Sequence, residues 1–334
     1  MNIEQVTVLT TNRCTAECKH CLMNSSPERK EKLSYSKIKY AIRKLLSISP
    51  QLKVVIFSGG EATLLKEDLL NAIAFCAENN LLTRLVTNCW WAKSKTTAKK
   101  YVQRLRESGL NEINFSVDDY HLPYIDFTHV KNAWQACKNE GFTSVVLASC
   151  YGNRTILSRQ HIQLLLGESI QPYWNDDGSI NNNKYYATDG TLYLISNARL
   201  QNLGRARNLL SGEIIYPDSD ACLHQACPWV ANSIALSPTG DLLACCGIEL
   251  KKNNYLNFGN IENIDFNNII PDNTRHKKII ETLRNKGPYE LICMLKSTSS
   301  KKHIRKKYSS ICEICEDIMN LENLPNLLES IFYK

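Results

Sequence analysis

The sequence lacks the segments that carry a chain into or across a membrane. No run of about 18 or more apolar residues occurs, which excludes a transmembrane helix of ordinary length. The first residues, MNIEQVTVLTTNRC, contain an acidic Glu4 and no basic start followed by an apolar core, so they do not form a secretory signal peptide. We therefore expect a cytoplasmic, reducing location and no membrane partner.

Compositional bias is also absent. Hydrophobic residues make up 43% of the 334 residues and charged residues 22%, which excludes a disordered, collagen-like or coiled-coil protein. The formal net charge is only +7, and much of the excess lies in residues 296–307. That stretch is either a solvated surface or a dock for an acidic partner. No base-reading motif accompanies it, so nucleic acid is not an expected partner.

Cysteine is the residue in excess. The chain has 14 cysteines, yet it is far too long to be a small disulfide-stapled scaffold. In a reducing compartment, clustered cysteines more often bind metal or do chemistry than form disulfides. The spacing of the cysteines is therefore the first guide to function.

The first half of the chain alternates strand-like and helix-like patterns. Apolar, β-rich runs lie at 6–10, 53–58, 83–87, 112–117 and 144–149, with a sixth expected near 191–195. Helical spacing occupies 34–48, 66–79, 94–108 and 128–140. Five such βα units predict a parallel sheet, open or closing toward a barrel, with its site at the carboxyl ends of the strands.

After about residue 204 the pattern changes. Residues 232–237, the turn PTGD and residues 242–246 predict a β-hairpin. Residues 251–275 are Asn-rich and loop-like, and 319–332 predict a short amphipathic helix interrupted at Pro325. We therefore predict two domains, 1–205 and 206–334, of which the second is smaller, irregular and rich in cysteine.

Three cysteines follow the first predicted strand in the motif CTAECKHC: Cys14, Cys18 and Cys21. Cysteine is the usual ligand of iron–sulfur clusters, and this spacing lets one loop bind three irons of a [4Fe–4S] cube. The fourth iron has no ligand in the motif, so an external molecule can bind there. A zinc ion is the alternative, but it would want a fourth Cys or His nearby, and His20 would strain the loop.

Glycines and polar residues follow the next predicted strands. The second strand ends in FSGGE, where glycines allow a ligand to approach the backbone and a carboxylate can receive an ammonium group. Each of these residues is, in the alternative, an ordinary turn or capping residue. The residues at the ends of strands two to four are Gly59, Gly60, Glu61, Thr87, Asn88, Ser116 and Asp118.

Together these motifs resemble the signature of the radical SAM superfamily. The resemblance implies a partial (β/α)6 TIM-like barrel and a [4Fe–4S] cluster whose open iron is chelated by S-adenosylmethionine (SAM). It implies that His20 leans toward the adenine, and that the GGE motif binds the amino group of SAM. It also implies that the polar strand ends bind the SAM carboxylate and ribose, and that Gly204 lines the adenine side. Two departures are Ala62, where the family usually has Pro, and Cys89, where it commonly has Gly.

A second set of cysteines lies in the later half. A local clip, CEIC, contains Cys312 and Cys315, while Cys227 precedes a proline. With one of the adjacent Cys245 and Cys246, they would complete a second, fully ligated [4Fe–4S] cluster. A structural zinc site with the same ligands is the alternative. Four other cysteines are most simply buried apolar residues: Cys76, Cys89, Cys137 and Cys150.

Cys245 and Cys246 should not both bind one cluster, because adjacent strand residues point to opposite faces. One is then a ligand, and the other is a free thiol. The free thiol is either packed or open toward the radical site, where it could donate a hydrogen atom.

The whole layout resembles radical SAM enzymes with a C-terminal SPASM- or twitch-like auxiliary domain of α+β type. More closely it resembles the peptide epimerases that make D-residues in ribosomal peptides. The matching blocks are CTAECKHC, FSGGE, TNCWW, SVDDYH, CPW with PTGD and ACC, and SSICEIC. The resemblance implies that a 5′-deoxyadenosyl radical removes the Cα hydrogen of an L-residue. Cys246 would return a hydrogen, and Cys245 would bind the auxiliary cluster.

The same resemblance implies two partners, a ribosomal precursor peptide and an electron donor such as flavodoxin or ferredoxin. It leaves proton transfer open, because Asn232 and Ser233 stand where a carboxylate would be a natural acid–base group.

The first alternative is a peptide cross-linking enzyme that forms thioether or carbon–carbon bonds. Such relatives commonly have a longer cysteine array. The second alternative is a non-catalytic iron–sulfur or zinc protein, which needs no SAM cradle. A tRNA-modifying enzyme is less favoured because the charge is mild.

Overall fold

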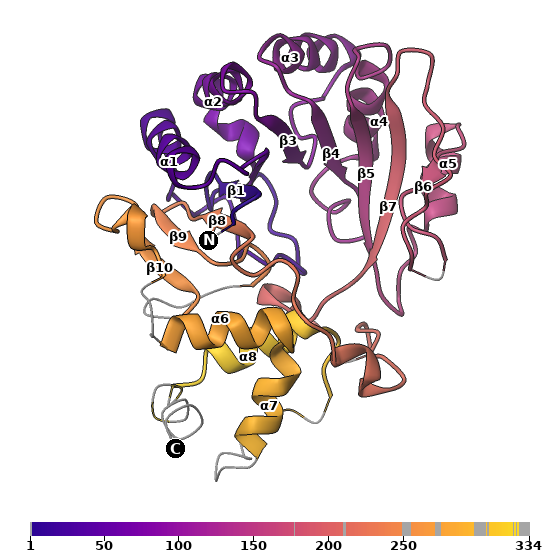
Figure 1. The fold of residues 1–334 in the computed structure, drawn as a ribbon. Coiled ribbons are helices and arrows are strands. Elements are labelled where there is room, and N and C mark those ends of the chain that lie inside the picture. Colours follow the sequence, from indigo (N-terminus) through magenta and orange to yellow (C-terminus); the bar gives the residue numbers. More distant parts are fainter. Residues whose placement is uncertain are drawn as a thin grey trace.

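One sheet runs through both halves of the chain (Figure 1). The computed structural model describes residues 2–176, 178–209, 212–248, 255–270, 275–296, 305, 307–322, 324 and 326. In these residues the 10-stranded sheet has the order β10-β9-β8-β1-β2-β3-β4-β5-β7-β6. No helix in the described segments combines the length and the apolar character needed to cross a membrane.

Six parallel strands form the barrel part of this sheet. They are β1 (Gln5–Leu9), β2 (Val54–Ser58), β3 (Leu82–Thr87), β4 (Glu112–Ser116), β5 (Ser144–Tyr151) and β7 (Leu192–Arg199). A short strand, β6 (Gln171–Pro172), lies at the edge beside β7. The barrel stays open, because β6 and β10 are the two ends of the sheet. This is the predicted α/β fold with a partial, six-stranded parallel barrel.

Helices cover the outer face of the barrel (Figure 1). They are α1 (Tyr35–Ile48), α2 (Glu67–Glu78), α3 (Lys95–Glu107), α4 (Phe127–Ala136) and α5 (Arg159–Leu166). Side-chain caps explain where several begin: Ser34 accepts a hydrogen bond from the N–H of Lys37, and Ser94 forms a capping box with Thr97. Strand residues that face these helices, such as Leu85 and Phe115, are fully buried.

The second half adds strands to the same sheet. In it, β8 (Ser233–Leu236) pairs in parallel with β1, while β9 (Asp241–Leu243) and β10 (Asn257–Asn260) continue antiparallel. The predicted hairpin is thus present, and residues predicted as loop contain β10 and the turn η4 (Phe266–Asn268). Side chains of Ile234, Leu242 and Phe266 belong to the barrel's own hydrophobic core. The sheet and this core therefore cross the predicted boundary at 205/206.

A second core lies below the sheet (Figure 1). It is built by α6 (Arg275–Asn285), α7 (Pro288–Lys296) and α8 (Ile311–Met319), with the turns η2 (Gly204–Asn208) and η3 (Asp220–Leu223) beside them. One further turn, η1 (Ala62–Leu65), follows β2. Most of the predicted helix at 319–332 and of the basic stretch at 296–307 lies outside the described residues.

Candidate active site

A cavity of about 430 Å³ opens inside the barrel. Its wall combines the three-cysteine loop with inward-facing side chains of the strands. Among the predicted site residues, its lining includes Cys14, Cys18, His20, Cys21, Gly59, Gly60, Thr87, Asn88, Ser116 and Cys246. The structure therefore brings together residues that are more than 200 positions apart in the sequence, at the strand ends where the βα pattern predicted a site.

The cysteine loop is held so that its thiols face N–H donors. The backbone N–H of Ala16 lies 3.4 Å from the Cys14 sulfur, and that of Ser25 lies 3.4 Å from the Cys21 sulfur. The side-chain amide of Asn88 also donates toward Cys14, at 3.6 Å. Hydrogen bonds to sulfur stabilise the thiolate that binds iron and tune a cluster. Without metal, burial raises the pKa of Cys14 to about 12.

The surroundings of the loop fit a cluster and a polar cofactor. Two buried polar atoms beside it, Nδ1 of His20 and Oγ of Ser25, have no hydrogen-bond partner among the described residues. A Cβ at Gly60 would lie 2.1 Å from the carbonyl oxygen of Arg13, and Gly59 has φ +125°. The GG pair thus lets β2 approach the loop closely. Unpaired polar atoms and a glycine-lined wall are what a bound cofactor would use.

The carboxylate of Glu61 is buried and hydrogen-bonded by the loops around the cavity, and its contact with an ammonium group stays a prediction. It is 1% exposed, and Oε1 accepts hydrogen bonds from the Thr63 hydroxyl at 2.6 Å and the Thr87 hydroxyl at 2.8 Å. The other oxygen accepts from the backbone N–H of Asn88 at 2.9 Å. Burial raises the pKa of Glu61. Its oxygens accept hydrogen bonds from the neighbouring loops, whereas the two glycines of the same motif line the cavity.

The polar residues at the end of β3 also form hydrogen bonds within the protein. The Thr87 hydroxyl binds Glu61 and accepts from the indole N–H of Trp91 at 3.0 Å. The Asn88 amide donates to the Thr15 hydroxyl at 3.0 Å, so it supports the cysteine loop. Cys89 has φ +70°, a backbone conformation that favours glycine and explains why glycine suits this position.

Asp118 is likewise used internally rather than facing the cavity. It is 2% exposed, and Oδ1 lies 2.8 Å from Nδ1 of His121 and accepts from the N–H of Tyr120 at 3.0 Å. The Cys150 thiol lies 3.4 Å from the other oxygen. Burial raises the pKa of Asp118, but the bond to His121 outweighs it and holds the pKa well below its usual value. Ser116 lines the cavity, and the ribose contact expected at these strand ends stays a prediction.

His121 was not singled out by sequence reasoning, although it stands in the SVDDYH block. Burial lowers its pKa, while hydrogen bonds to Asp118 and Cys18 outweigh this and raise it to about 10. Among the described residues, His20, Asp118 and His121 form the group of metal-ligating side chains whose atoms all lie within 4.8 Å of one another. The bonds to Asp118 account for this closeness without an ion.

His20 stacks on an aromatic ring, at the position expected to lean toward adenine. Its centroid is 4.7 Å from that of Tyr120, whose hydroxyl donates to Glu213 at 3.0 Å. Burial lowers the pKa of His20 to about 4, and the charges of His121 and Arg205 act in the same direction. The imidazole is therefore neutral at pH 7, which suits a stacking surface.

The later cysteines meet at a second place. Cys245 interacts electrostatically with Cys312 and Cys227, and Cys315 interacts with all three. Burial, first, and the neighbouring sulfurs of Cys227 and Cys246 raise the pKa of Cys312 to about 12. The backbone N–H of Gly247 donates to the Cys245 sulfur at 3.2 Å. The structure thus brings the four predicted ligands together from three separate segments.

The adjacent cysteines are split between the two places. Cys245 is buried among the second cysteine group. Cys246 lines the barrel cavity with the first cysteine loop and also interacts electrostatically with Cys245 and Cys312. Cys246 is half-buried beside Leu9 and Met23. The remaining cysteines divide into buried Cys76, Cys89 and Cys137, exposed Cys222 and Cys293, and Cys150, which contacts Asp118 rather than only packing.

Sequence reasoning also missed the polar wall of the cavity. Arg84 and Asn114 lie on inward-facing positions of β3 and β4, and Arg84 pairs with Glu112 at 2.7 Å. A buried hydroxyl on β1, Oγ1 of Thr7, has no partner. The available signal was charge and polarity at alternate positions of strands predicted to be buried.

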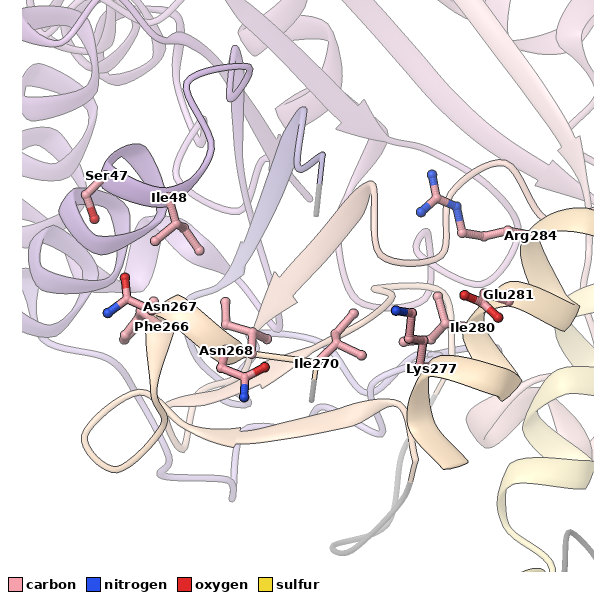
Figure 2. Close-up of a pocket in the computed structure, with 11 residues that line it drawn as sticks. Ser47, Ile48, Phe266, Asn267, Asn268, Ile270, Lys277, Ile280, Glu281 and Arg284 are labelled. Atoms are coloured by element: carbon pink, nitrogen blue, oxygen red, sulfur yellow. The ribbon is translucent and has the colours of Figure 1, made fainter. Parts of the chain in front are cut away.

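A larger cavity, of about 540 Å³, lies away from the cysteines (Figure 2). It lies between the end of α1, the η4 turn and α6. Figure 2 shows amide and aliphatic side chains at one end and Lys277, Glu281 and Arg284 at the other. Its lining contains no thiol, histidine or hydroxyl apart from Ser47, so the chemistry of this chain is better placed in the barrel.

Comparison with known proteins agrees with the site. An open parallel barrel with three cysteines after its first strand is the arrangement of a SAM-dependent radical enzyme. Residues 8–154 match the sequence model of the Radical SAM superfamily. The match covers less than half of the 334 residues and identifies a radical SAM domain in that part of the chain.

The individual proteins described next are similar to this chain at low sequence identity. A protein of Bacillus subtilis (strain 168) named "Putative peptide biosynthesis protein YydG" is 24% identical over 127 residues, which are 38% of this chain and 40% of that protein. The chain thus spans less than half the length of this curated relative. The solved structure "Native anSMEcpe with bound AdoMet" has a TM-score of 0.54 at 13% identity, covering 99% of this chain and 100% of that chain. The structure "Native anSMEcpe with bound AdoMet and Cp18Cys peptide" has a TM-score of 0.53 at 12% identity and covers 98% of each chain. These likenesses show the fold.

Proposed function

We propose that this chain is a radical SAM peptide epimerase that converts L- to D-residues in a ribosomally made peptide. The observation that carries the proposal is the division of the adjacent cysteines. Cys245 joins the second cysteine group, while the thiol of Cys246 opens into the cavity of the first cysteine loop. A free thiol inside the radical cavity is the chemical group that an epimerase needs and that a carrier protein does not.

Relatives support a peptide substrate. The Bacillus protein is named for peptide biosynthesis, and the anSMEcpe structure contains AdoMet and a peptide. The cavity of this chain also has a polar wall that could bind peptide amides, formed by Arg84, Asn114 and Thr7.

Within this proposal, Cys14, Cys18 and Cys21 hold the SAM-binding cluster, and the cavity wall around His20, the glycines and Ser116 holds SAM. When bound, the two cofactors supply the radical chemistry that removes a Cα hydrogen atom from the peptide. The Cys246 thiol then gives its hydrogen atom to the opposite face of that carbon. The buried walls of the barrel keep water from the reacting carbon.

The remaining assignments belong to the same proposal. Cys227, Cys245, Cys312 and Cys315 hold an auxiliary [4Fe–4S] cluster within a SPASM- or twitch-like region at 206–334. This cluster would relay the electron that, together with a proton from solvent, converts the Cys246 thiyl radical back to the thiol. Flavodoxin or ferredoxin would reduce the first cluster. A cytoplasmic location fits these oxygen- and redox-sensitive groups.

Two measurements on the reduced, iron-loaded protein test the proposal. With SAM, 5′-deoxyadenosine should form, and its absence would favour a non-catalytic iron–sulfur protein. With a precursor peptide encoded beside the gene, in D2O, the product should gain one deuterium at Cα for each D-residue and should lose no hydrogens. A product lighter by two hydrogens would instead indicate a cross-linking enzyme.

The matched pair Cys246→Ala and Cys222→Ala isolates the thiol. Cys246→Ala should still consume SAM but incorporate no deuterium at Cα, because the hydrogen donor is gone. Cys222 is exposed and outside the cavity, so Cys222→Ala should match the wild type. Full epimerisation by Cys246→Ala would refute the donor role.

A further inference from the structure

The turn η2 contacts the backbone of the first cysteine loop through one arginine. The backbone N–H of Arg205 donates to the carbonyl of Cys21 at 3.0 Å. Its guanidinium donates from Nη1 to the carbonyl of Cys18 at 2.9 Å and from Nη2 to the carbonyl of Ser25 at 2.6 Å. Arg205 therefore makes three hydrogen bonds to the loop, two to the carbonyls of cysteines and one to the carbonyl of Ser25, where the loop ends.

The residue before this arginine sets how closely the turn approaches the loop. Gly204 has φ +51°, and a Cβ there would lie 2.4 Å from the carbonyl oxygen of Leu22 and 2.7 Å from that of Cys21. Both contacts are backbone atoms, so a side chain at 204 would push the loop away. The adenine-side contact expected for Gly204 stays a prediction.

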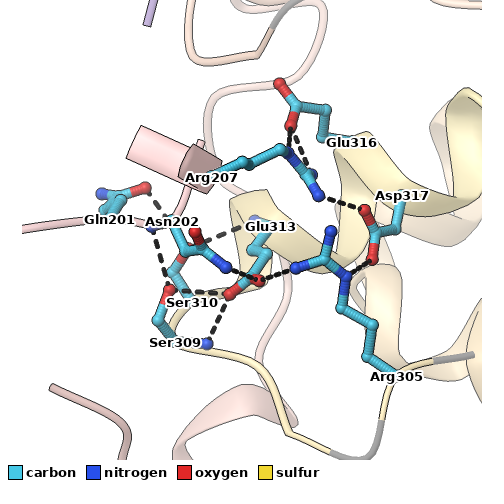
Figure 3. Close-up of polar contacts among 9 residues, drawn as sticks. All are labelled: Gln201, Asn202, Arg207, Arg305, Ser309, Ser310, Glu313, Glu316 and Asp317. Carbon is cyan, nitrogen blue, oxygen red and sulfur yellow. Dashed lines mark hydrogen bonds and ion pairs between the residues drawn. The ribbon is translucent and has the colours of Figure 1, made fainter. Parts of the chain in front are cut away.

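Two residues further on, the same turn contacts the second cysteine site (Figure 3). The guanidinium of Arg207 donates from Nε to Glu316 at 2.7 Å and pairs through Nη1 with Asp317 at 2.7 Å. Both carboxylates are on α8, the helix that carries Cys312 and Cys315. Glu316 is buried, so its charge has a fixed partner rather than water.

We propose that Arg205 and Arg207 are positioning residues that hold the two cysteine sites, Arg205 the first loop and Arg207 the helix α8. The inference rests on the proposed iron–sulfur sites. A metal-binding loop loses less conformational freedom on loading when its backbone is already fixed. The planar guanidinium suits Arg205 because it can donate to two carbonyls at once, which a lysine ammonium on a flexible stem does less well.

The test measures iron retention in two full-length backgrounds that each keep one site. The first background replaces Cys227, Cys245, Cys312 and Cys315 by Ala, and the second replaces Cys14, Cys18 and Cys21 by Ala. Arg205→Ala should speed loss of iron to a chelator by about 10-fold in the first background and leave the second unchanged. Arg207→Ala should do the reverse. Arg205→Lys should lie between wild type and Arg205→Ala.

A second readout does not depend on iron. Hydrogen exchange of residues 14–25 in the iron-free full chain should become faster in Arg205→Ala and in Gly204→Ala, but not in Arg207→Ala. The exposed Arg154 supplies a matched control, and Arg154→Ala should change neither measurement. A spectrum of the loaded first site by EPR should broaden in Arg205→Ala, whereas a general loss of stability would not be confined to one site.

The outcomes separate the inference from the proposed function. Wild-type iron retention and wild-type exchange in Arg205→Ala would overturn the inference. Equal effects of Arg205→Ala on both sites would also overturn it, since they would indicate general destabilisation. A wild-type chain that takes up iron but makes no 5′-deoxyadenosine would refute the proposed function, while the exchange of residues 14–25 would still decide the role of Arg205.

Discussion

Glu61 organises the loops beneath the cavity. Its two oxygens accept hydrogen bonds from Thr63, Thr87 and Asn88, all of them buried. In Glu61→Ala these donors lose their acceptor in a buried site. We expect the free energy of unfolding of the iron-free protein to fall by about 2–4 kcal/mol, as measured by urea denaturation. Glu61→Gln keeps one acceptor oxygen and should lose less.

A surface carboxylate gives the matched control for this prediction. Glu78 is exposed near the end of α2, and Glu78→Ala should leave the unfolding free energy within about 0.5 kcal/mol of wild type. If Glu61→Ala were as stable as wild type but no longer bound SAM, Glu61 would be a ligand contact after all. The hydrogen bonds of Glu61 to Thr63, Thr87 and Asn88 would then not contribute to the stability of the fold.

The hydrogen-bond partners of Glu61 and Asp118 show what a sequence motif can and cannot predict. FSGGE and SVDDYH correctly marked the strand ends beside the cavity. They could not show which way a carboxylate turns, because that depends on donors from other segments. Glu61 binds N–H and O–H groups of the β3 loop, and Asp118 binds His121 and Cys150. Sequence spacing contains no information about such distant donors.

At the scale of elements, the helix α8 depends on a buried carboxylate as well as on its cysteines. Glu313 is fully buried, and it accepts from the Asn202 amide at 2.7 Å, the Ser309 N–H at 2.7 Å and Arg305 at 3.1 Å (Figure 3). Glu313→Ala leaves the Asn202 amide and the Ser309 N–H without their acceptor, while Arg305 keeps its pair with Asp317, so we expect a loss of about 2–4 kcal/mol of unfolding free energy. Hydrogen exchange of residues 311–319 should quicken more than that of β1 to β5.

Asp317 on the same helix is the control for this network. Its side chain is more exposed than that of Glu313, and it also pairs with arginines. Asp317→Ala should therefore cost less stability than Glu313→Ala, because water can solvate the freed guanidinium groups. Equal losses in the two variants would mean that burial does not set the strength of this network.

Local patterns predicted the barrel elements closely. The expected strand at 112–117 is β4 (Glu112–Ser116), and the expected helix at 34–48 is α1 (Tyr35–Ile48) with Ser34 as its cap. Periodicity and capping are local signals, so they survive without knowledge of the fold. The pairing of β8 with β1 joins residues over 200 positions apart and left no local signal. The convergence of four cysteines was predictable only because clustered cysteines are typical of metal sites.

For the whole molecule, this strand pairing decides how independent the two halves are. Removing residues 206–334 would strip β8 from β1 and leave Gln5 to Val8 as an open sheet edge. It would also remove Ile234, Leu242 and Phe266 from the barrel core. The fragment 1–205 should therefore aggregate or lack cooperative unfolding, in spite of holding the complete three-cysteine motif.

Light scattering and near-UV circular dichroism of the fragment 1–205 check this prediction. The control is the full-length chain with Cys227, Cys245, Cys312 and Cys315 replaced by Ala. It retains β8 and the shared core, so it should stay monomeric and unfold cooperatively even without a second metal site. That pair of results would place the dependence in the strand pairing rather than in the metal. A monomeric, cooperatively folded fragment would show instead that 1–205 is a domain in its own right, because its open edge at β1 would then cost too little to matter.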